Sequence, residues 1–537
     1  MDAGITMMEL DPSTSTSPPS LLEQLPTEIL HKVLTYLKPN APSNTELEHH
    51  LRHSLPGKYP RYYQNSHRAI QFLTQFPADP NLNNSAVDAQ RNLLSCLLIS
   101  RTIHVATLPI LYRRISVYKY SCVVKLAAQI SRYPHLGQYV RRLDLNGLQK
   151  DHNDLAPAGE KRGEVISALL MQSLNFMPRL WELRTPVDSM DGFDWQLLDF
   201  RVLQNILRGK FQHLRILDWG PKLSDAFLDY LENEPIRVST SITHLKLRCE
   251  DTRMTGVIKR LLTAMPSIQI LDFSGSNVKV ADVLEGIPTN ARLTSLKTTL
   301  ISSAAWSDVS SFMNRNPSIF EGLMVLDLSR QWTLPLESPD DISGVLYQLP
   351  PSLRSLNLRN CSMEPSHLDI IREQCPKLME LSIGTGIRLH DLESTILPPH
   401  IEKHHDDQYG ENSNSDDSQD DSPAIDALYG TILGPMGRAV ALCKLRKRLN
   451  SVSVNRSGNM HHKFRMSGLQ YLDIRSLPIE EQRKIRTSIL LGQHSQPLGI
   501  IQISGSEFFE DGMLHRLCSA VGWRFCWRGG RAWIARK

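Results

Sequence analysis

The fold of this chain is decided by a six-residue pattern that is clearest in LRSLNL, residues 353–358. Side chains two residues apart share one face of a β-strand, so the spaced leucines point inward and the residues between them line an exposed sheet. The same pattern, apolar-x-x-apolar-x-apolar, occurs about eleven times in the 537 residues. Its middle apolar residues are Leu143, Leu183, Leu217, Leu245, Leu271, Leu296, Leu326, Leu356, Leu381, Leu472 and Ile501.

The spacing of these markers predicts a repeated strand-helix unit. Apart from a first step of 40 residues and one gap of 91, consecutive markers lie 25 to 34 residues apart, which is room for a short strand and a helix. Residues 255–265 illustrate the helix, because Val257, Leu261 and Leu262 fall on one face and Pro266 ends it. Such a unit cannot bury its apolar face alone, so the units must stack. An ordinary α/β protein with leucine-rich strands is the alternative, and eleven units at this spacing argue against it.

The repeated pattern resembles leucine-rich repeats, specifically the longer ribonuclease-inhibitor-like repeats that carry a helix on the outside. Cys249 and Asn360 stand where that family often places Cys or Asn. The resemblance implies an α/β solenoid, with a parallel sheet inside and helices outside. The repeats are expected in residues 119–394 and again in 467–537, where the last stretch (523–534) alternates around Gly529-Gly530 and predicts a capping hairpin. Aromatic and arginine side chains in that hairpin are also compatible with stacking on nucleic-acid bases.

A second motif precedes the repeats. Residues 25–30 read LPTEIL, and the apolar positions continue to Leu37 on one helical face. Residues 93–102 (LLSCLLISRT) and 106–115 (ATLPILYRRI) follow after an interruption. Together they resemble the F-box, which has a leucine-rich helix and a small closing helix after its LPxEI start. The sequence departs from the F-box in the long insert at about 40–90, where the family has a few residues.

The F-box resemblance implies a small all-α unit at 21–118, after an N-terminal stretch (1–20) expected to be disordered. In that family the unit binds a Skp-family adaptor, which in turn holds a cullin. Carried over to this chain, the adaptor contact would be formed by Leu25, Pro26, Ile29, Leu37, Leu97, Leu98, Leu108, Leu111 and Tyr112.

The gap of 91 residues contains an inserted linker, residues 395–466, with two oppositely charged halves. Residues 405–426 carry eight acidic side chains and no Lys or Arg, and residues 427–466 carry eight basic side chains and no acidic ones. Solvated linkers commonly look like this. A sharper hypothesis is that Ser415, Ser418 and Ser422 are phosphorylated, which would deepen the negative charge. The basic half is also compatible with a nuclear-localisation or phosphate-binding patch.

Composition and motif searches argue against several other functions. Apolar residues make up 41% and the net charge is only +4, which demands neither a nucleic-acid nor a membrane partner. The eight cysteines form no CxxC pair and are expected to be reduced thiols, and no apolar run reaches membrane-spanning length. No phosphate-binding loop, zinc motif or nucleophile elbow is present. We therefore expect a non-enzyme without cofactor or metal, in the cytoplasm, the nucleus or both.

These observations predict a substrate-recognition adaptor of a Skp/cullin/F-box-type ubiquitin ligase, whose concave repeat face binds a protein substrate. The side chain between the second and third apolar residue of each unit is expected to face that substrate. These side chains are Asp144, Arg184, Asp218, Lys246, Asp272, Lys297, Asp327, Asn357, Ser382, Asp473 and Gln502. The alternative is a leucine-rich-repeat interaction scaffold that acts without ligase assembly.

Overall fold

A computed structural model describes the parts of the chain that carry these motifs. The described residues are 25–36, 94–117, 120–145, 161–185, 200–219, 241–247, 254–276, 279–299, 304–330, 340–396, 466, 468–491, 498–504, 508, 512–528 and 531–536. The stretch 1–20, the whole insert at 40–90 and nearly all of the charged linker lie outside them.

The described strands form one sheet that follows the chain in order. Strands β1 to β12 are parallel neighbours in sequence order, and β14 and β13 complete the sheet at its C-terminal end. The strands are β1 (Arg114–Ser116), β2 (Arg142–Asp144), β3 (Glu182–Arg184), β4 (Ile216–Trp219), β5 (His244–Leu247), β6 (Ile270–Phe273), β7 (Ser295–Thr298), β8 (Val325–Asp327), β9 (Ser355–Asn357), β10 (Glu380–Ser382), β11 (Tyr471–Asp473), β12 (Ile500–Ser504), β13 (Trp523–Arg528) and β14 (Arg531–Arg536).

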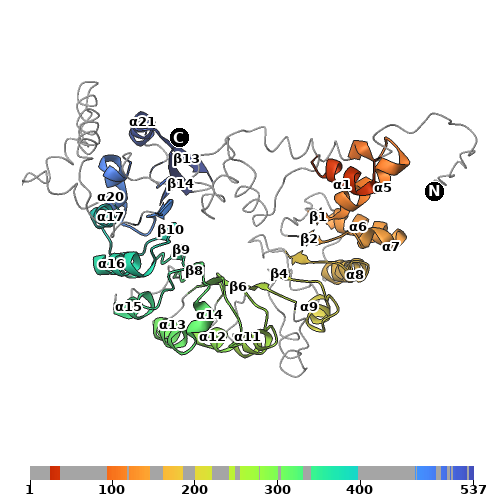
Figure 1. Cartoon of the computed structure of the whole chain (residues 1–537), viewed down its shortest axis with the longest axis horizontal. Helices are drawn as coiled ribbons and strands as arrows, with labels where there is room; N and C mark the ends of the chain where they lie inside the picture. The colour runs from red at the N-terminus through yellow and green to blue at the C-terminus, as the bar shows by residue number, and fades with distance from the viewer. Residues whose placement is uncertain are drawn as a thin grey trace, which may run out of the picture.

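Helices cover one side of this sheet, and the described elements follow an open arc with the strands on its inner side and the helices outside (Figure 1). The outer helices are α6 (Tyr120–Arg132), α7 (Pro134–Gly137), α8 (Lys161–Asn175), α9 (Phe200–Leu207), α11 (Met254–Thr263), α12 (Val280–Glu285), α13 (Ala304–Arg315), α14 (Pro317–Phe320), α15 (Asp340–Leu346), α16 (Pro365–Gln374), α17 (Leu389–Ile396), α20 (Ile479–Arg483) and α21 (Gly512–Ala520). Two 3₁₀ turns, Lys484–Thr487 and Ile489–Leu491, follow α20. The arrangement is a solenoid of stacked strand-helix units, with a parallel sheet inside and helices outside, as the periodicity predicts.

The predicted leucine markers are the rungs of the solenoid core. Leu143 is in register with Leu183, Leu183 with Leu217, and the pairing continues strand by strand to Leu472 and Ile501. All eleven markers have at most 1% of their surface exposed and belong to one continuous apolar core. A buried leucine of this kind contributes roughly 1.5–3 kcal/mol to stability. The stacked rungs form one apolar core that runs along the whole sheet.

The solenoid begins one strand earlier than expected. Strand β1 lies within the range assigned to the helical unit at 21–118, yet Ile115 is in register with Leu143 of the first predicted repeat. Val117 follows Ile115 at the spacing of the repeat pattern and is buried in the solenoid core, but no leucine marks this unit and its residues adjoin the F-box-like segment. Its parallel pairing with β2 makes it the N-terminal edge of the sheet.

The gap of 91 residues does not interrupt the sheet. Strands β10 and β11 are parallel neighbours, with Leu381 opposite Leu472. The linker at 395–466 is therefore an insertion between two adjacent repeats, as the spacing predicts.

The predicted C-terminal hairpin is confirmed, and it sits against the last repeat. Strand β13 pairs antiparallel with β14, and β14 pairs antiparallel with β12. Trp523 and Trp533 are buried, with 0% and 4% exposed, so these two indoles are not available to stack on bases. The hairpin covers the end of the core, which is the capping role that a solenoid requires.

Gly386 occupies a position between repeats that only glycine fits. Its φ of +89° is left-handed, and a Cβ added there would lie 2.3 Å from the carbonyl oxygen of Met363. We expect Gly386→Ala to lower the free energy of unfolding by about 2 kcal/mol, from the strain alone. Urea unfolding followed by circular dichroism measures this loss. Gly256→Ala is the matched control, because a Cβ there meets nothing within 4 Å; an equal loss in both variants would contradict the argument.

Candidate functional site

A small helical unit precedes the solenoid and has its own core. Helix α1 (Thr27–Tyr36) packs against α5 (Arg101–Tyr112) (Figure 1). Leu30, Leu34, Cys96, Ile103, Ala106 and Ile110 form its buried cluster, against which Leu25 packs. This cluster is separate from the solenoid core, although α5 also contacts α7 and β1.

The second half of this unit folds differently from the expected pair of helices. Residues 94–96 form a single helical turn, and α5 then runs without interruption through Pro109. Helix α5 begins at Ser100, whose side chain accepts a hydrogen bond from the backbone N–H of Ile103 at 3.3 Å. Such a cap favours a helix start at this point over a continuous leucine helix. The Thr107 hydroxyl donates to the Ile103 carbonyl at 2.7 Å.

Large apolar side chains remain exposed on the helical unit. Among the described residues, six of the eleven large hydrophobic side chains that are exposed belong to it. They are Ile29 (41%), Val33 (42%), Leu94 (45%), Leu98 (88%), Ile99 (62%) and Val105 (54%). A unit this small leaves part of its apolar surface uncovered, and a concentration of this kind is typical of an interaction surface.

The residues expected to contact an adaptor divide into three groups. Pro26, Ile29 and Leu98 are exposed. Leu25, Leu97, Leu108, Leu111 and Tyr112 are half-buried, and Leu37 lies outside the described residues. Val33, Leu94, Ile99 and Val105 are exposed but were not among the expected contacts. Helical periodicity places Val33 on the same face as Leu30 and Leu34, and only the packing of α1 on α5 shows which side chains are covered.

The predicted concave-face residues form one continuous row across the sheet. Asp144 is opposite Arg184, Arg184 opposite Asp218, and the register continues unbroken to Asp473 and Gln502. The structure therefore brings together residues that are up to hundreds of positions apart in sequence. Asp218, Asn357 and Asp473 are buried, and Asp144, Arg184, Lys246, Asp272, Lys297 and Asp327 are half-buried.

Several acidic and amide members of this row stabilise turns. The Oδ1 atoms of Asp272, Asp327, Asn357 and Asp473 each accept a hydrogen bond from the backbone N–H two residues later, at 3.0 to 3.1 Å. Asp and Asn favour this local bond, which turns the chain out of the strand. The recurrent Leu-Asp pairing thus has a structural cause that does not require a ligand.

Ion pairs offset much of the remaining charge. Lys246 donates to Asp218 at 3.1 Å, Arg142 to Asp144 at 2.6 Å, and Arg184 to Glu182 at 2.6 Å. The row therefore presents mostly compensated charge, which suits recognition of a mixed-charge polypeptide better than recognition of a polyanion.

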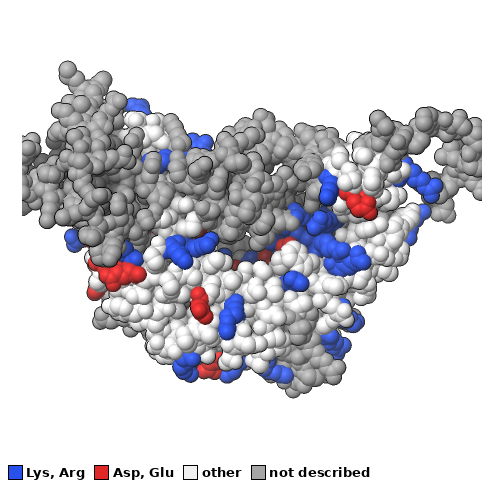
Figure 2. Space-filling model, in the orientation of Figure 1, with Lys and Arg blue, Asp and Glu red and all other residues white. Residues whose placement is uncertain are grey.

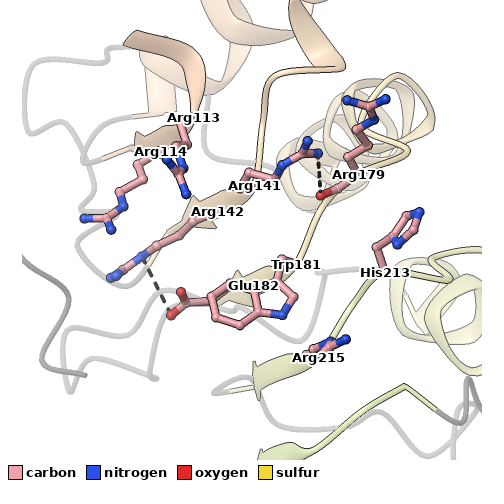
Figure 3. Close-up of a pocket in the computed structure, with 9 residues that line it drawn as sticks. All are labelled: Arg113, Arg114, Arg141, Arg142, Arg179, Trp181, Glu182, His213 and Arg215. Atoms are coloured by element: carbon pink, nitrogen blue, oxygen red, sulfur yellow. Dashed lines mark hydrogen bonds and ion pairs between the residues drawn. The ribbon is translucent and has the colours of Figure 1, made fainter. Parts of the chain in front are cut away.

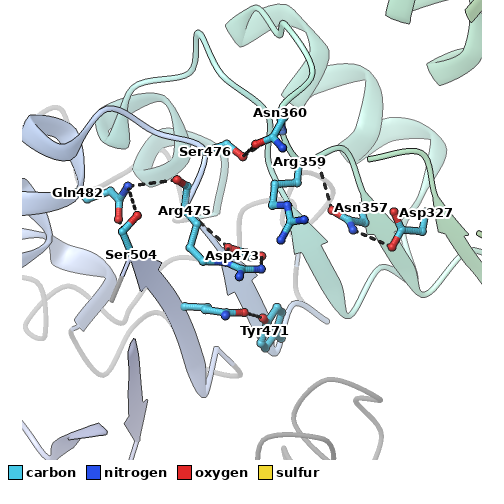
Figure 4. A network of polar contacts seen from close by, with 11 residues as sticks. Asp327, Asn357, Arg359, Asn360, Tyr471, Asp473, Arg475, Ser476, Gln482 and Ser504 are labelled. Carbon is cyan, nitrogen blue, oxygen red and sulfur yellow. Dashed lines mark hydrogen bonds and ion pairs between the residues drawn. The ribbon is translucent and has the colours of Figure 1, made fainter. Parts of the chain in front are cut away.

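The C-terminal part of the inner face is held by a polar network that crosses the insertion (Figure 4). Asn357 donates to Asp327 at 2.7 Å, and Arg475 donates to Asp473 at 2.7 Å. Nearby, the Ser476 hydroxyl bonds Asn360, 116 positions earlier in the chain. Gln482 donates to the Leu477 carbonyl at 2.7 Å and to the Ser504 hydroxyl at 3.0 Å.

One cluster of arginine side chains was not predicted from the sequence. A pocket at the starts of β1 to β4 is lined by Arg113, Arg114, Arg141, Arg142, Arg179, Trp181, Glu182, His213 and Arg215 (Figure 3). The sequence signal is the pair of Arg-Arg dipeptides at the beginnings of two successive strands. These arginines lie before the exposed position that the repeat pattern predicts in each strand.

Other kinds of site find no support in the part of the chain that the structure describes. No group of three or more His, Cys, Asp or Glu there could hold a metal ion. None of the helices described is long and apolar enough to cross a membrane. Among the described residues, Cys96, Cys122, Cys361, Cys375 and Cys518 form no disulfide bond, and burial raises the pKa of Cys375 to about 12.

Comparisons with known proteins add little to this description. No protein-family model matches the chain, and no curated protein matches it either. Among solved structures, the chain is similar to an internalin from Listeria monocytogenes, with 14% sequence identity and a TM-score of 0.23. That similarity covers 55% of this chain and 88% of the internalin chain.

Proposed function

We propose that this protein is a non-catalytic substrate-recognition adaptor of a Skp/cullin/F-box-type ubiquitin ligase. The unit formed by α1 and α5 would bind a Skp-family adaptor and, through it, a cullin. The inner face of the solenoid would hold a protein substrate. Holding the substrate beside the charged conjugating enzyme raises its effective concentration without any chemistry in this chain.

The observation that carries the proposal is the apolar surface of the helical unit. Leu98 and Ile99 are 88% and 62% exposed, and Ile29 on α1 is 41% exposed. Exposing such side chains to water is unfavourable by about 1.5–3 kcal/mol each relative to burial. A partner that covers them recovers this free energy, and the LPTEIL motif supplies the resemblance that names the partner class.

The structure also improves the choice of test variant. Leu25 packs against the small core of the unit, so Leu25→Ala would weaken the fold together with any contact. Leu98 is exposed, and its replacement leaves that core intact. We expect Leu98→Asp to weaken adaptor binding by about 100-fold or more, because a carboxylate would replace a buried apolar contact.

Co-purification of the full chain with the Skp-family adaptor measures this effect, with affinities from calorimetry. Tyr347→Asp is the matched control, since Tyr347 is 63% exposed and lies after α15, far along the solenoid. Binding by the wild type and the control, but not by Leu98→Asp, is the expected result. A folded wild type that fails to bind the adaptor would overturn the ligase assignment and leave the interaction scaffold.

A further inference from the structure

The arginine pocket lies where the solenoid meets the helical unit. Lys and Arg side chains gather in a hollow at this end of the molecule (Figure 2). The pocket has a volume of about 590 Å³, and its walls come from consecutive strand starts and from the turns before them (Figure 3). Neither the adaptor surface nor the concave row includes these residues.

A backbone ladder brings the arginines together. The N–H of Arg141 donates to the Arg113 carbonyl at 2.9 Å, that of Trp181 to Arg141 at 2.8 Å, and that of Arg215 to Trp181 at 2.9 Å. These residues therefore occupy equivalent positions in four consecutive repeats. The following positions on the same ladder are Thr243, Gln269, Thr294, Met324 and Arg354. Arginines at neighbouring ladder positions are thus confined to the first repeats, because Arg354 lies between Met324 and Met379.

The pocket carries far more positive than negative charge. Six guanidinium groups and one carboxylate, Glu182, line the pocket, and Glu182 lies 2.6 Å from Arg184 outside it and 3.7 Å from Arg142. Arg142 is also paired with Asp144 at 2.6 Å. Burial lowers the pKa of Arg114, and the neighbouring Arg142 lowers it further. Burial also lowers the pKa of Arg141, and Arg179 and Arg113 add to that effect. The arginines therefore repel one another, and a bound anion would relieve this repulsion.

We propose that this pocket binds a peptide segment that carries two phosphorylated serines or threonines three residues apart. Guanidinium groups bind phosphate through paired, charge-assisted hydrogen bonds. A single phosphate carries a charge of about −2 at most, which is less than the guanidinium groups of Arg113, Arg141, Arg179 and Arg215 bring to the pocket. Two phosphates on one segment match the charge better.

The spacing of the two phosphorylated residues follows from the distance between the strands of the sheet. Neighbouring strands lie about 4.8 Å apart, so Arg141 and Arg215, two strands apart on the ladder, are separated by about 10 Å at the backbone. A peptide in the polyproline II conformation has three residues per turn and advances about 3.1 Å per residue, so side chains three residues apart lie on one face and span about 9 Å. Trp181 lies between the two arginines on the ladder and is 42% exposed, which offers a flat surface to the peptide between its phosphates. Single-stranded nucleic acid instead favours several successive aromatic platforms.

The chain itself contains a sequence of this kind. Ser415 and Ser418 are three residues apart within the acidic stretch 405–426. Synthetic peptides of residues 411–424 are therefore suitable probes, either unphosphorylated, phosphorylated at Ser415 alone, or phosphorylated at both serines.

The test measures binding of these peptides to the full-length protein by fluorescence anisotropy. We expect the doubly phosphorylated peptide to bind at least about tenfold more tightly than the singly phosphorylated one, and the unphosphorylated one most weakly. Arg113→Glu/Arg215→Glu should weaken binding by about 100-fold or more, since both side chains are exposed and their loss spares the core. Arg354→Glu is the matched control, because Arg354 is exposed and occupies the same ladder position in a later repeat.

Three results would overturn the proposal. One is equal binding of the singly and doubly phosphorylated peptides, and another is an equal loss in the Arg354→Glu control. The third is an oligouridylate that binds more tightly than any peptide and depends on the same arginines. The inference is independent of adaptor docking, because the arginine variants should retain the Skp-family adaptor.

Discussion

Trp523→Ala is expected to lower the free energy of unfolding by about 4 kcal/mol, the largest effect of any single change considered for this chain. Trp523 is wholly buried at the start of β13, and its Nε1 donates to the Leu491 carbonyl at 2.7 Å. The Arg536 guanidinium lies 4.6 Å from the centre of its ring. Removing the indole leaves a cavity beneath the hairpin that covers the last repeat.

Urea unfolding followed by circular dichroism measures this loss. Trp181→Ala is the control, because Trp181 is 42% exposed and contributes little to the core; its expected cost is below about 0.5 kcal/mol. Since a solenoid is stabilised by contacts between neighbouring repeats, hydrogen exchange should rise first in β12 and β14. A Trp523→Ala protein as stable as wild type would show that the hairpin does not cap the solenoid.

Asn360→Ala is expected to cost about 3 kcal/mol. The Asn360 side chain is buried, donates to the Arg330 carbonyl at 3.0 Å and accepts from the Ser476 hydroxyl at 3.3 Å. Its backbone N–H also donates to that hydroxyl, at 3.0 Å. Truncation leaves buried polar groups without partners, at about 1–3 kcal/mol each. Its φ of 66° is left-handed, which alanine tolerates less well than asparagine.

Asn360→Gly separates the two contributions. Glycine removes the side-chain bonds but accepts the left-handed backbone, so this variant should be more stable than Asn360→Ala by about 1 kcal/mol. Both variants are compared with wild type by urea unfolding. Because Ser476 lies on the far side of the 395–466 insertion, a loss in both variants also shows that the two halves of the solenoid unfold together. Equal stability of the alanine and glycine variants would contradict the role given to the backbone.

The accuracy of the sequence-based predictions varied with the range of the interactions involved. The strands at Leu143 to Ile501 could be predicted because each apolar marker depends on its own repeat and its immediate neighbours. The helix at residues 255–265 and the C-terminal hairpin were predicted for the same reason. Strand β1 was not, since Ile115 belongs to the stretch 106–115 that resembles the F-box and no leucine marks the repeat pattern there.

The same difference between local and long-range interactions applies to the candidate sites. The register of the concave row could be predicted, because every second residue of a strand shares a face. The local bonds of Asp272, Asp327 and Asp473 could not, because they depend on how the chain turns after each strand. Likewise, the LPTEIL motif located the helical unit, but only the packing of α1 on α5 separated buried Leu30 from exposed Ile29.

The sequence by itself determined that this chain is a stacked strand-helix repeat with a distinct helical segment before it, because hydrophobic periodicity is a local property. Only the tertiary structure decided that Arg113, Arg141, Arg179 and Arg215 share one pocket. Tens of residues separate these side chains in the chain, and each alone reads as an ordinary exposed arginine. Neighbouring strands of the sheet lie about 4.8 Å apart. Arginines that are far apart in sequence therefore lie close together, and their combined positive charge exists only in the assembled sheet.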